Sequence, residues 1–231
     1  MSLTAKIILP GFELHCTIST AGAVCQRLLD TMYRDRATVF HRMLGWDLRV
    51  DDRGWERDEY DAMDPLYLIL ALPDGAHGGS LRLMPTTAQT MLHDHFLDLL
   101  DGVPLRSSGI WEVTRLCVAP RCARLGLSAI HMACILMIIG AEFGLRNGLE
   151  KYVGVCEAST YEMYQRCGWT PTRLGVRRRN GEEIWAGLWA INEDVCASIR
   201  GRLRYSPDIR WCCDFPASES TIHGLPRSRS P

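Results

Sequence analysis

Charged side chains recur beside apolar runs in the segment from Arg36 to Arg115. The set holds both signs of charge: Arg36, Asp58, Asp61, Arg82, Glu112 and Arg115. A folded domain seldom places so many ionisable groups next to its core, because a buried charge must be paired. A mixed set of cations and carboxylates is typical of a polar cleft for a zwitterionic substrate.

Two of the acids lie three residues apart. Asp58 and Asp61 share a face if the chain is locally helical there. Paired carboxylates can hold an ammonium group, or shift each other's pKa for acid–base chemistry. A solvated loop is the more common explanation for such a pair on its own.

The pair Glu112 and Arg115 lies in a predicted strand, residues 110–118. In a regular strand, residues three apart point to opposite faces. The two side chains can share a site only if a β-bulge intervenes, and bulges do occur beside active sites. An ion-paired structural role is the default interpretation for both residues.

The elements that would position these residues alternate between strand and helix signals. Strands are predicted at 6–9, 66–72, 80–84, 110–118, 152–156 and 183–191, and helices at 21–43, 127–145 and 159–167. Turn residues at 73–79 predict a hairpin between the second and third strands. This order predicts a mixed α/β fold, and no internal repeat is found.

The run from Leu125 to Ala141 is apolar enough to suggest a membrane span. A spanning helix needs roughly 20 apolar residues, and this run is closed by Arg124 and Glu142. A helix buried against the sheet explains it better.

Length and composition fit one domain at 1–205, followed by a Pro/Ser/Arg-rich tail at 206–231 that we expect to be flexible. The net charge of −1 gives no support for a nucleic-acid binder. The ten cysteines form no Cys-x-x-Cys motif, and the N-terminus has no signal-peptide pattern. We therefore expect a cytoplasmic protein with reduced thiols and no metal site.

Six short patterns follow one another in the chain. They are Arg36-x-x-x-Phe40, Gly45-Trp46, Glu56-x-Asp58-x-Tyr60-Asp61, Arg82 to Thr86, Met91 to Phe96, and Trp111 to Arg115. In this order and spacing they resemble the acyl-homoserine-lactone synthases, the autoinducer synthases of bacterial quorum sensing. The resemblance extends loosely to Ile191, and Thr114 stands where that family often has serine.

The resemblance implies a fold similar to that of N-acetyltransferases: a three-layer α/β fold with a mixed, twisted sheet, flanked by helices and split by a V-shaped opening. It implies two substrates, S-adenosylmethionine and an acyl thioester, with acyl carrier protein preferred over coenzyme A as the donor. The amine attacks the thioester, and the carboxylate then displaces 5′-methylthioadenosine to close a lactone. No cofactor is implied, since S-adenosylmethionine is a substrate.

The same resemblance assigns roles to residues. Glu112 is the first candidate for the base and Asp61 the second. S-adenosylmethionine would be bound by Arg36, Phe40, Trp46, Asp58, Asp61, Arg82, Phe96 and Arg115. The segment from Arg36 to Trp46 is interpreted as a lid.

The acyl half of the reaction is expected after Val118. An acyl-chain pocket is predicted around Met84, Gly154, Val155, Met163 and Leu188. Gly154 stands where many family members that make 3-oxo products carry threonine, so the sequence favours a product without a 3-oxo group. Because carrier proteins are acidic, docking is assigned to basic side chains: Arg121, Arg124, Lys151, Arg177 and Arg178.

Two other functions compete with this one. An acetyl-coenzyme-A-dependent N-acetyltransferase of a small amine would share the fold but would not need the patterns between Arg36 and Asp61. A ligand sensor or nucleic-acid module is opposed by the near-zero net charge.

Overall fold

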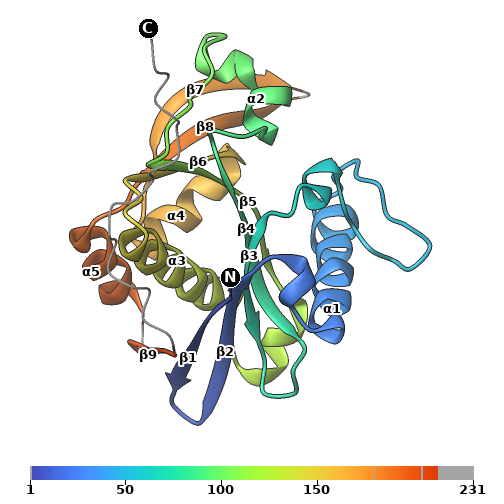
Figure 1. Ribbon diagram of the computed structural model, residues 1–231, viewed down its shortest axis with the longest axis vertical. Coiled ribbons are helices and arrows are strands. Elements are labelled where there is room, and N and C mark those ends of the chain that lie inside the picture. The colour runs from blue at the N-terminus through green and yellow to red at the C-terminus, as the bar shows by residue number, and fades with distance from the viewer. Residues whose placement is uncertain (1, 180, 204, 213–231) are drawn as a thin grey trace, which may run out of the picture.

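The computed structural model describes residues 2–179, 181–203 and 205–212 (Figure 1). The strands are β1 (Leu3–Leu9), β2 (Phe12–Ser19), β3 (Leu66–Ala71), β4 (His77–Pro85), β5 (Ile110–Val118), β6 (Lys151–Glu157), β7 (Thr172–Arg179), β8 (Glu182–Ala190) and β9 (Asp208–Trp211). The α-helices are α1 (Gln26–Arg36), α2 (Met91–His95), α3 (Ala129–Arg146), α4 (Tyr161–Cys167) and α5 (Glu193–Arg202). Three shorter helical segments matter for the site: η2 (Ala37–Met43), η3 (Glu59–Ala62) and η5 (Pro120–Leu125).

The strands form one sheet in the order β7-β8-β6-β5-β4-β3-β2-β1-β9. Neighbouring strands are antiparallel except β5 and β6, which pair in parallel over three residues only, from Ile110 opposite Lys151 to Glu112 opposite Val153. Beyond that point the described residues of β5 and β6 form no further pairs. The sheet therefore opens between its two halves, as the predicted V-shaped opening requires.

Helices cover both faces of the sheet. Figure 1 shows α1 on one side of β3 and β4, and α3, α4 and α5 on the other. The alternation along β3 explains the two layers: Leu68 and Leu70 enter the core under α3, whereas Tyr67 and Ile69 join the cluster under α1. The predicted three-layer α/β architecture is confirmed, and so is the hairpin of β3 and β4.

Helix α3 is the apolar run that raised the question of a membrane span. It is long and apolar enough to cross a bilayer, but 67% of it is buried inside the protein. It packs against β4 and β5 on the sheet and against α5. A single such helix is weak evidence for a span, and burial in the core explains its composition.

A β-bulge lies in β5 at Arg115. Ser80 pairs with Cys117 and Arg82 with Thr114, so one residue of β4 stands opposite two residues of β5. Arg115 adopts the left-handed conformation with a φ of 54°. The bulge turns the Arg115 side chain toward the carboxylates of Glu56 and Asp58. From sequence, Glu112 and Arg115 could share a site only if a β-bulge intervened between them, and the structure has this bulge.

Some elements were missed or misplaced from sequence. Strands β2, β7 and β9 and helix α5 were not predicted, and the predicted helix at 21–43 is α1 followed by the π-helical segment η2. Strand β9 pairs with β1, so structure continues past Ser206, where the tail was expected to begin. The rest of that expected tail, residues 213–231, lies outside the described residues.

Candidate active site

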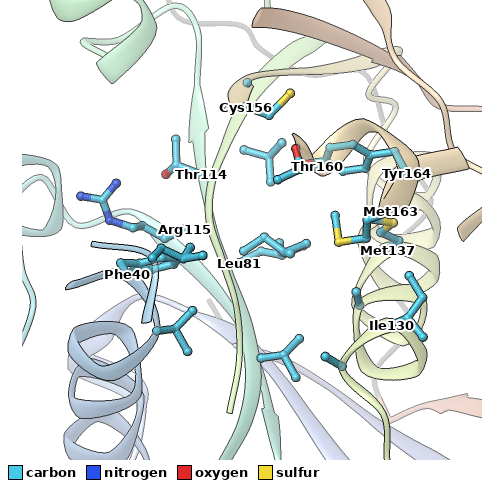
Figure 2. Close-up of a pocket in the computed structure, with 18 of the residues that line it drawn as sticks. Phe40, Leu81, Thr114, Arg115, Ile130, Met137, Cys156, Thr160, Met163 and Tyr164 are labelled. Carbon is cyan, nitrogen blue, oxygen red and sulfur yellow. The ribbon is translucent and has the colours of Figure 1, made fainter. Parts of the chain in front are cut away.

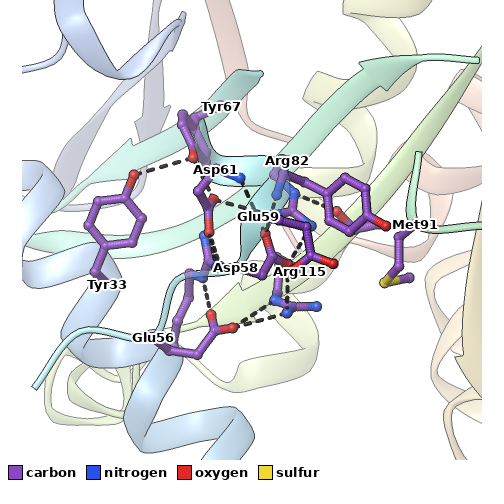
Figure 3. A network of polar contacts seen from close by, with 12 residues as sticks. Tyr33, Glu56, Asp58, Glu59, Asp61, Tyr67, Arg82, Met91 and Arg115 are labelled. Carbon is purple, nitrogen blue, oxygen red and sulfur yellow. Dashed lines mark hydrogen bonds and ion pairs between the residues drawn. The ribbon is translucent and has the colours of Figure 1, made fainter. Parts of the chain in front are cut away.

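A buried network of ion pairs joins five of the six charged residues that the sequence singled out, all but Glu112 (Figure 3). At its deep end, the guanidinium of Arg36 at the C-terminus of α1 donates from Nε to Glu56 over 2.6 Å. Its two other nitrogens donate to the two carboxylate oxygens of Asp61, each over 2.9 Å. Arg36 is 1% exposed, so it is paired within the protein and does not face solvent.

The outer end of the network is formed by Arg82 of β4 and Arg115 of β5. Arg82 binds both oxygens of Asp58 and donates from Nε to the Thr114 hydroxyl over 2.9 Å. Arg115 donates to Glu56 over 3.0 Å and to Asp58 over 2.8 Å. Three guanidinium groups thus face three carboxylates, which is the charge balance that such burial needs.

The two aspartates are held by a local helix. Segment η3 follows Asp58, whose side chain accepts from the backbone N–H of Tyr60 and Asp61, while the Asp61 side chain accepts from the N–H of Asp58. This reciprocal capping box fixes both carboxylates toward the arginines. The sequence left open whether the two aspartates share a face or lie in a solvated loop; the structure places Asp58 at the N-cap and Asp61 in the helical turn, with both carboxylates on the arginines.

Asp61 is a poor proton acceptor in this setting. Burial alone would raise its pKa, but the guanidinium groups of Arg36 and Arg82 outweigh burial and hold the pKa of Asp61 well below its usual range. The hydroxyl of Tyr67 also donates to Asp61, over 2.5 Å. This carboxylate therefore stays ionised and occupied.

Glu112 has the opposite electrostatic character. Its carboxylate is 1% exposed and accepts from the backbone N–H of Met91 and Leu92 at the start of α2, over 3.2 and 2.6 Å. Burial raises the pKa of Glu112 to about 7, although the two backbone donors act in the other direction. A carboxyl that titrates near neutral pH is suited to exchange a proton with an amine.

A cavity of about 680 Å³ opens beside this network and runs under the split of the sheet (Figure 2). Phe40, Trp46 and Arg115 lie at its polar end. Phe40 and Trp46 stack with ring centroids 5.0 Å apart and planes inclined by 7°. The Arg115 guanidinium carbon lies 5.7 Å from the Phe40 ring centroid. The bulge therefore joins the cavity to the ion-pair network.

The other part of the cavity is apolar and lies between the sheet and helices α3 and α4. Ile130 and Met137 of α3 and Met163 and Tyr164 of α4 line it, as Figure 2 shows. Of the predicted acyl-pocket residues, Gly154, Val155 and Met163 line this cavity.

Met84 and Leu188 do not line this cavity. Met84 is buried at the far end of β4, opposite Glu112. On β8 the neighbouring Trp189 faces the cavity, so alternation sends Leu188 to the other side, into the cluster around Leu92. The sequence gives no register for β4 and β8, so it could not show that these two residues lie outside the cavity.

The residues expected to bind S-adenosylmethionine divide into three groups. Phe40, Trp46 and Arg115 line the cavity. Arg36, Asp58, Asp61 and Arg82 belong to the network behind it. Phe96 is not among the cavity-lining residues, because it lies under the guanidinium of Arg177, 4.8 Å from its ring centroid.

The predicted docking residues are not equivalent. Arg121 is held by Asp35 over 2.7 Å, and Arg177 by Asp98 over 3.0 Å. Lys151 is half-buried in β6. Two of the five are exposed: Arg124 is solvent-exposed, and Arg178 is 83% exposed with Glu183 at 3.4 Å.

Two functional candidates were missed from sequence. Glu56 bridges Arg36 and Arg115, and it was read only as part of a motif. Glu157 at the end of β6 accepts from the Trp46 indole N–H over 2.6 Å, and it was not noticed because 111 positions separate the two. Among the described residues, no group of three or more His, Cys, Asp or Glu side chains could hold a metal ion.

Gly154 is required by space. A Cβ atom at this position would lie 2.7 Å from the backbone oxygen of Val113, where β5 and β6 begin to separate. We expect Gly154→Ala to lower the free energy of unfolding by about 1–3 kcal/mol in urea denaturation, because the strands must move apart. Gly201→Ala is the control: it lies in α5 with open space around it and should stabilise by about 0.5–1 kcal/mol. Equal midpoints for Gly154→Ala and the parent protein would contradict the close approach.

Comparisons with known proteins agree with this geometry. The model of the autoinducer synthase family matches residues 23–195. An acyl-homoserine-lactone synthase from Rhizobium etli is 39% identical over 180 residues, which cover 77% of this chain and 84% of the relative.

Solved structures agree as well. The acyl-homoserine-lactone synthase LasI has a TM-score of 0.71 at 27% identity, over 83% of this chain and 94% of its own. The coenzyme-A-dependent synthase BjaI, solved with S-adenosylmethionine and isopentyl-coenzyme A, has a TM-score of 0.66 at 27% identity, over 76% of this chain and 82% of its own. A putative N-acetyltransferase from Lactobacillus plantarum shares the fold alone, with a TM-score of 0.51 at 17% identity over 78% of this chain and 99% of its own. The chain belongs to the autoinducer synthase family and is an acyltransferase of the acyl-homoserine-lactone synthase type.

Proposed function

We propose that this protein makes an N-acyl-L-homoserine lactone from S-adenosylmethionine and an acyl thioester. The observation that carries the proposal is the continuity of the cavity, which runs from Arg115 and the Phe40–Trp46 stack to the apolar space beside Met163. One end suits a charged nucleotide-like amine and the other an acyl chain. The ligands named for BjaI are of these two kinds.

The reaction has two bond-forming steps. The deprotonated amine of S-adenosylmethionine attacks the thioester carbonyl, an amide bond forms, and the donor leaves as a thiol. The carboxylate of the methionine part then attacks the γ-carbon, the bond from that carbon to the sulfonium breaks, and neutral 5′-methylthioadenosine leaves.

Glu112 is the proposed proton acceptor for the first step. An α-amino group titrates at about 7.7–8.0, and the pKa of Glu112 is raised to about 7, so proton transfer between them is nearly balanced. Asp61 is the weaker candidate, because its low pKa makes the transfer unfavourable. Glu112 is not itself among the cavity-lining residues, but Thr114, two positions along β5, is. The proton of the substrate ammonium group would therefore reach Glu112 through a water molecule.

Arginines are proposed to bind the substrate carboxylate and to hold the site rigid. Arg115 lines the cavity and is the contact residue in this scheme. Arg36 and Arg82, with Asp58 and Asp61, position it from behind through the ion-pair network. Phe40 and Trp46 offer aromatic faces for the adenine and the sulfonium.

The acyl donor is proposed to be an acyl carrier protein. Arg124 is exposed in η5, next to the cavity-lining Ala123, and can meet an acidic partner there. Incubating the purified protein with S-adenosylmethionine and matched acyl carrier protein and acyl-coenzyme A donors tests this, with 5′-methylthioadenosine as the readout. Faster release with the coenzyme A donors would overturn the donor assignment but leave the synthase intact.

Acyl-chain length is proposed to be set by the apolar end of the cavity. Met163→Trp should shorten the acyl chain of the dominant product by about two or more methylene units. The indole would occupy the space that the end of a longer chain needs. A shorter chain gives up only about 1–3 kcal/mol of binding for each methylene it lacks. Mass spectrometry of the lactones checks this. Met84→Leu is the control, since Met84 lies outside the cavity, and its profile should match the parent's. An unchanged profile for Met163→Trp would remove α4 from the acyl pocket.

The oxidation state of the acyl chain is proposed from Gly154. Glycine offers no hydroxyl that could bind a 3-oxo group, and the strand contact at Val113 leaves no room for one. A product without a 3-oxo group is therefore proposed, and a dominant 3-oxo lactone in the same mass spectra would overturn it.

The alternative, acetylation of a small amine with acetyl-coenzyme A, has less support. The family match covers most of the chain, whereas the N-acetyltransferase likeness is one of fold. An ordinary acetyltransferase also has no need for the ion-pair network between α1 and β5.

A further inference from the structure

One hydrogen bond closes the cavity across the split of the sheet. Trp46 follows the helical segment η2 on the α1 side, and Glu157 is the last residue of β6 on the other side. The Trp46 indole N–H donates to Glu157 Oε1 over 2.6 Å. Both residues line the cavity, so the Glu157 carboxylate lies in the cavity wall beside the stack of Phe40 and Trp46.

The charges in this lining are few. The cavity is lined by two charged side chains of opposite sign, Arg115 and Glu157. Arg115 is already matched by Glu56 and Asp58. In the part of the chain that the structure describes, the Glu157 carboxylate accepts from uncharged groups alone, the Trp46 indole and the Ser159 hydroxyl at 3.3 Å. Within 2–179, 181–203 and 205–212, no ion pair is formed by Glu157.

A half-buried carboxylate without a cation, in a cavity that is otherwise largely apolar, attracts a positively charged ligand. The aromatic stack of Phe40 and Trp46 beside it favours a cation that carries carbon substituents and is weakly hydrated. A sulfonium fits this description better than an ammonium group, which needs several hydrogen-bond acceptors.

We propose that Glu157 is the counter-ion of the S-adenosylmethionine sulfonium. This inference rests on the proposed function and adds a substrate-contacting residue to it. Arg115 and Glu157 would then bind the opposite charges of one substrate, the carboxylate at the network and the sulfonium at the aromatic stack. In the second step the sulfonium becomes a neutral thioether, so the product loses this attraction and can leave.

The test compares two ligands that differ by one methyl group and the charge it confers, S-adenosylmethionine and S-adenosylhomocysteine. Calorimetric titration of Glu157→Gln should show about tenfold weaker binding of S-adenosylmethionine. Binding of S-adenosylhomocysteine should stay within about twofold of the parent's. The glutamine keeps an oxygen that accepts from Trp46, so the closure across the cavity is retained.

The control is Glu162→Gln, an exposed acid in the first turn of α4, which should change neither affinity. In the parent protein, raising the salt concentration should weaken S-adenosylmethionine more than S-adenosylhomocysteine, and Glu157→Gln should abolish that difference.

Equal losses for both ligands would show that Glu157 only holds Trp46 in place, and no loss would remove it from the site. Either result overturns the counter-ion role while the synthase stands. Failure of the parent protein to bind S-adenosylmethionine would instead defeat the proposed function itself.

Discussion

Glu112→Gln should lower the rate of lactone formation by at least about 100-fold and, at pH 8, make the protein more stable. The first effect is the usual contribution of a positioned base. The second follows from burial, which raises the pKa of this carboxyl to about 7. Glutamine is neutral at every pH, and its one carbonyl oxygen can still accept from the N–H of Leu92, the nearer of the two backbone donors.

The direction of the Glu112 pKa shift determines how the stability of the parent protein depends on pH. Between about pH 4.5 and 7 the folded protein keeps the Glu112 proton while the unfolded chain releases it. Rising pH therefore lowers the free energy of unfolding, by up to about 3 kcal/mol over that window. The variant lacks this loss, so the two proteins should be equally stable near pH 4, diverge between about pH 4.5 and 7, and keep a constant difference at higher pH.

Enzyme activity should change in the opposite direction. Lactone formation in the parent protein should rise with pH through about 7, because only the ionised form of Glu112 accepts a proton. Glu59→Gln is the matched control: this neighbouring acid is exposed and should affect neither rate nor stability. A Glu112→Gln protein that makes lactone at the parental rate would show that another group is the base.

Arg36→Met should cost about 3–5 kcal/mol of folding stability, the largest loss we expect from a single substitution outside the apolar core. Methionine fills much of the space but removes a cation that Glu56 and Asp61 share, so three buried carboxylates are left facing two guanidinium groups. Urea denaturation at neutral pH measures this loss. At low pH the difference between variant and parent should shrink, because protonation removes the uncompensated charges.

Arg34→Met provides the comparison for Arg36. Arg34 lies two residues earlier in α1 and pairs with Asp30 over 3.0 Å, with about half of its side chain exposed. An exposed pair of this kind is worth at most about 1 kcal/mol. Similar losses for the two variants would contradict the view that the buried network holds α1 against the sheet.

The fold was predictable where patterns are local. The apolar character of α3, the turn between β3 and β4 and the alternation of β5 each follow from neighbouring residues. Strand β9 was missed because its pairing partner β1 lies two hundred residues earlier in the chain. Its own sequence, Asp208–Trp211, alternates polar and apolar residues over four positions, which is too short to identify a strand.

The sequence identified most residues of the site but not what each of them does. Arg36 was expected to touch substrate, yet it is buried behind Glu56 and Asp61. Asp61 and Glu112 could not be ranked from sequence, because their opposite pKa shifts depend on how close Arg36 and Arg82 lie to Asp61 and on how deeply Glu112 is buried. Glu157 carries no local signal at all, since only the folded chain brings it to Trp46.

The most direct test of the account is a single reaction followed by mass spectrometry. The purified protein, given S-adenosylmethionine and a long-chain acyl carrier protein, should release 5′-methylthioadenosine and an N-acyl-homoserine lactone in equal amounts. No 5′-methylthioadenosine should form when the acyl donor is omitted. An acetylated amine made from acetyl-coenzyme A, with S-adenosylmethionine left intact, would contradict the account.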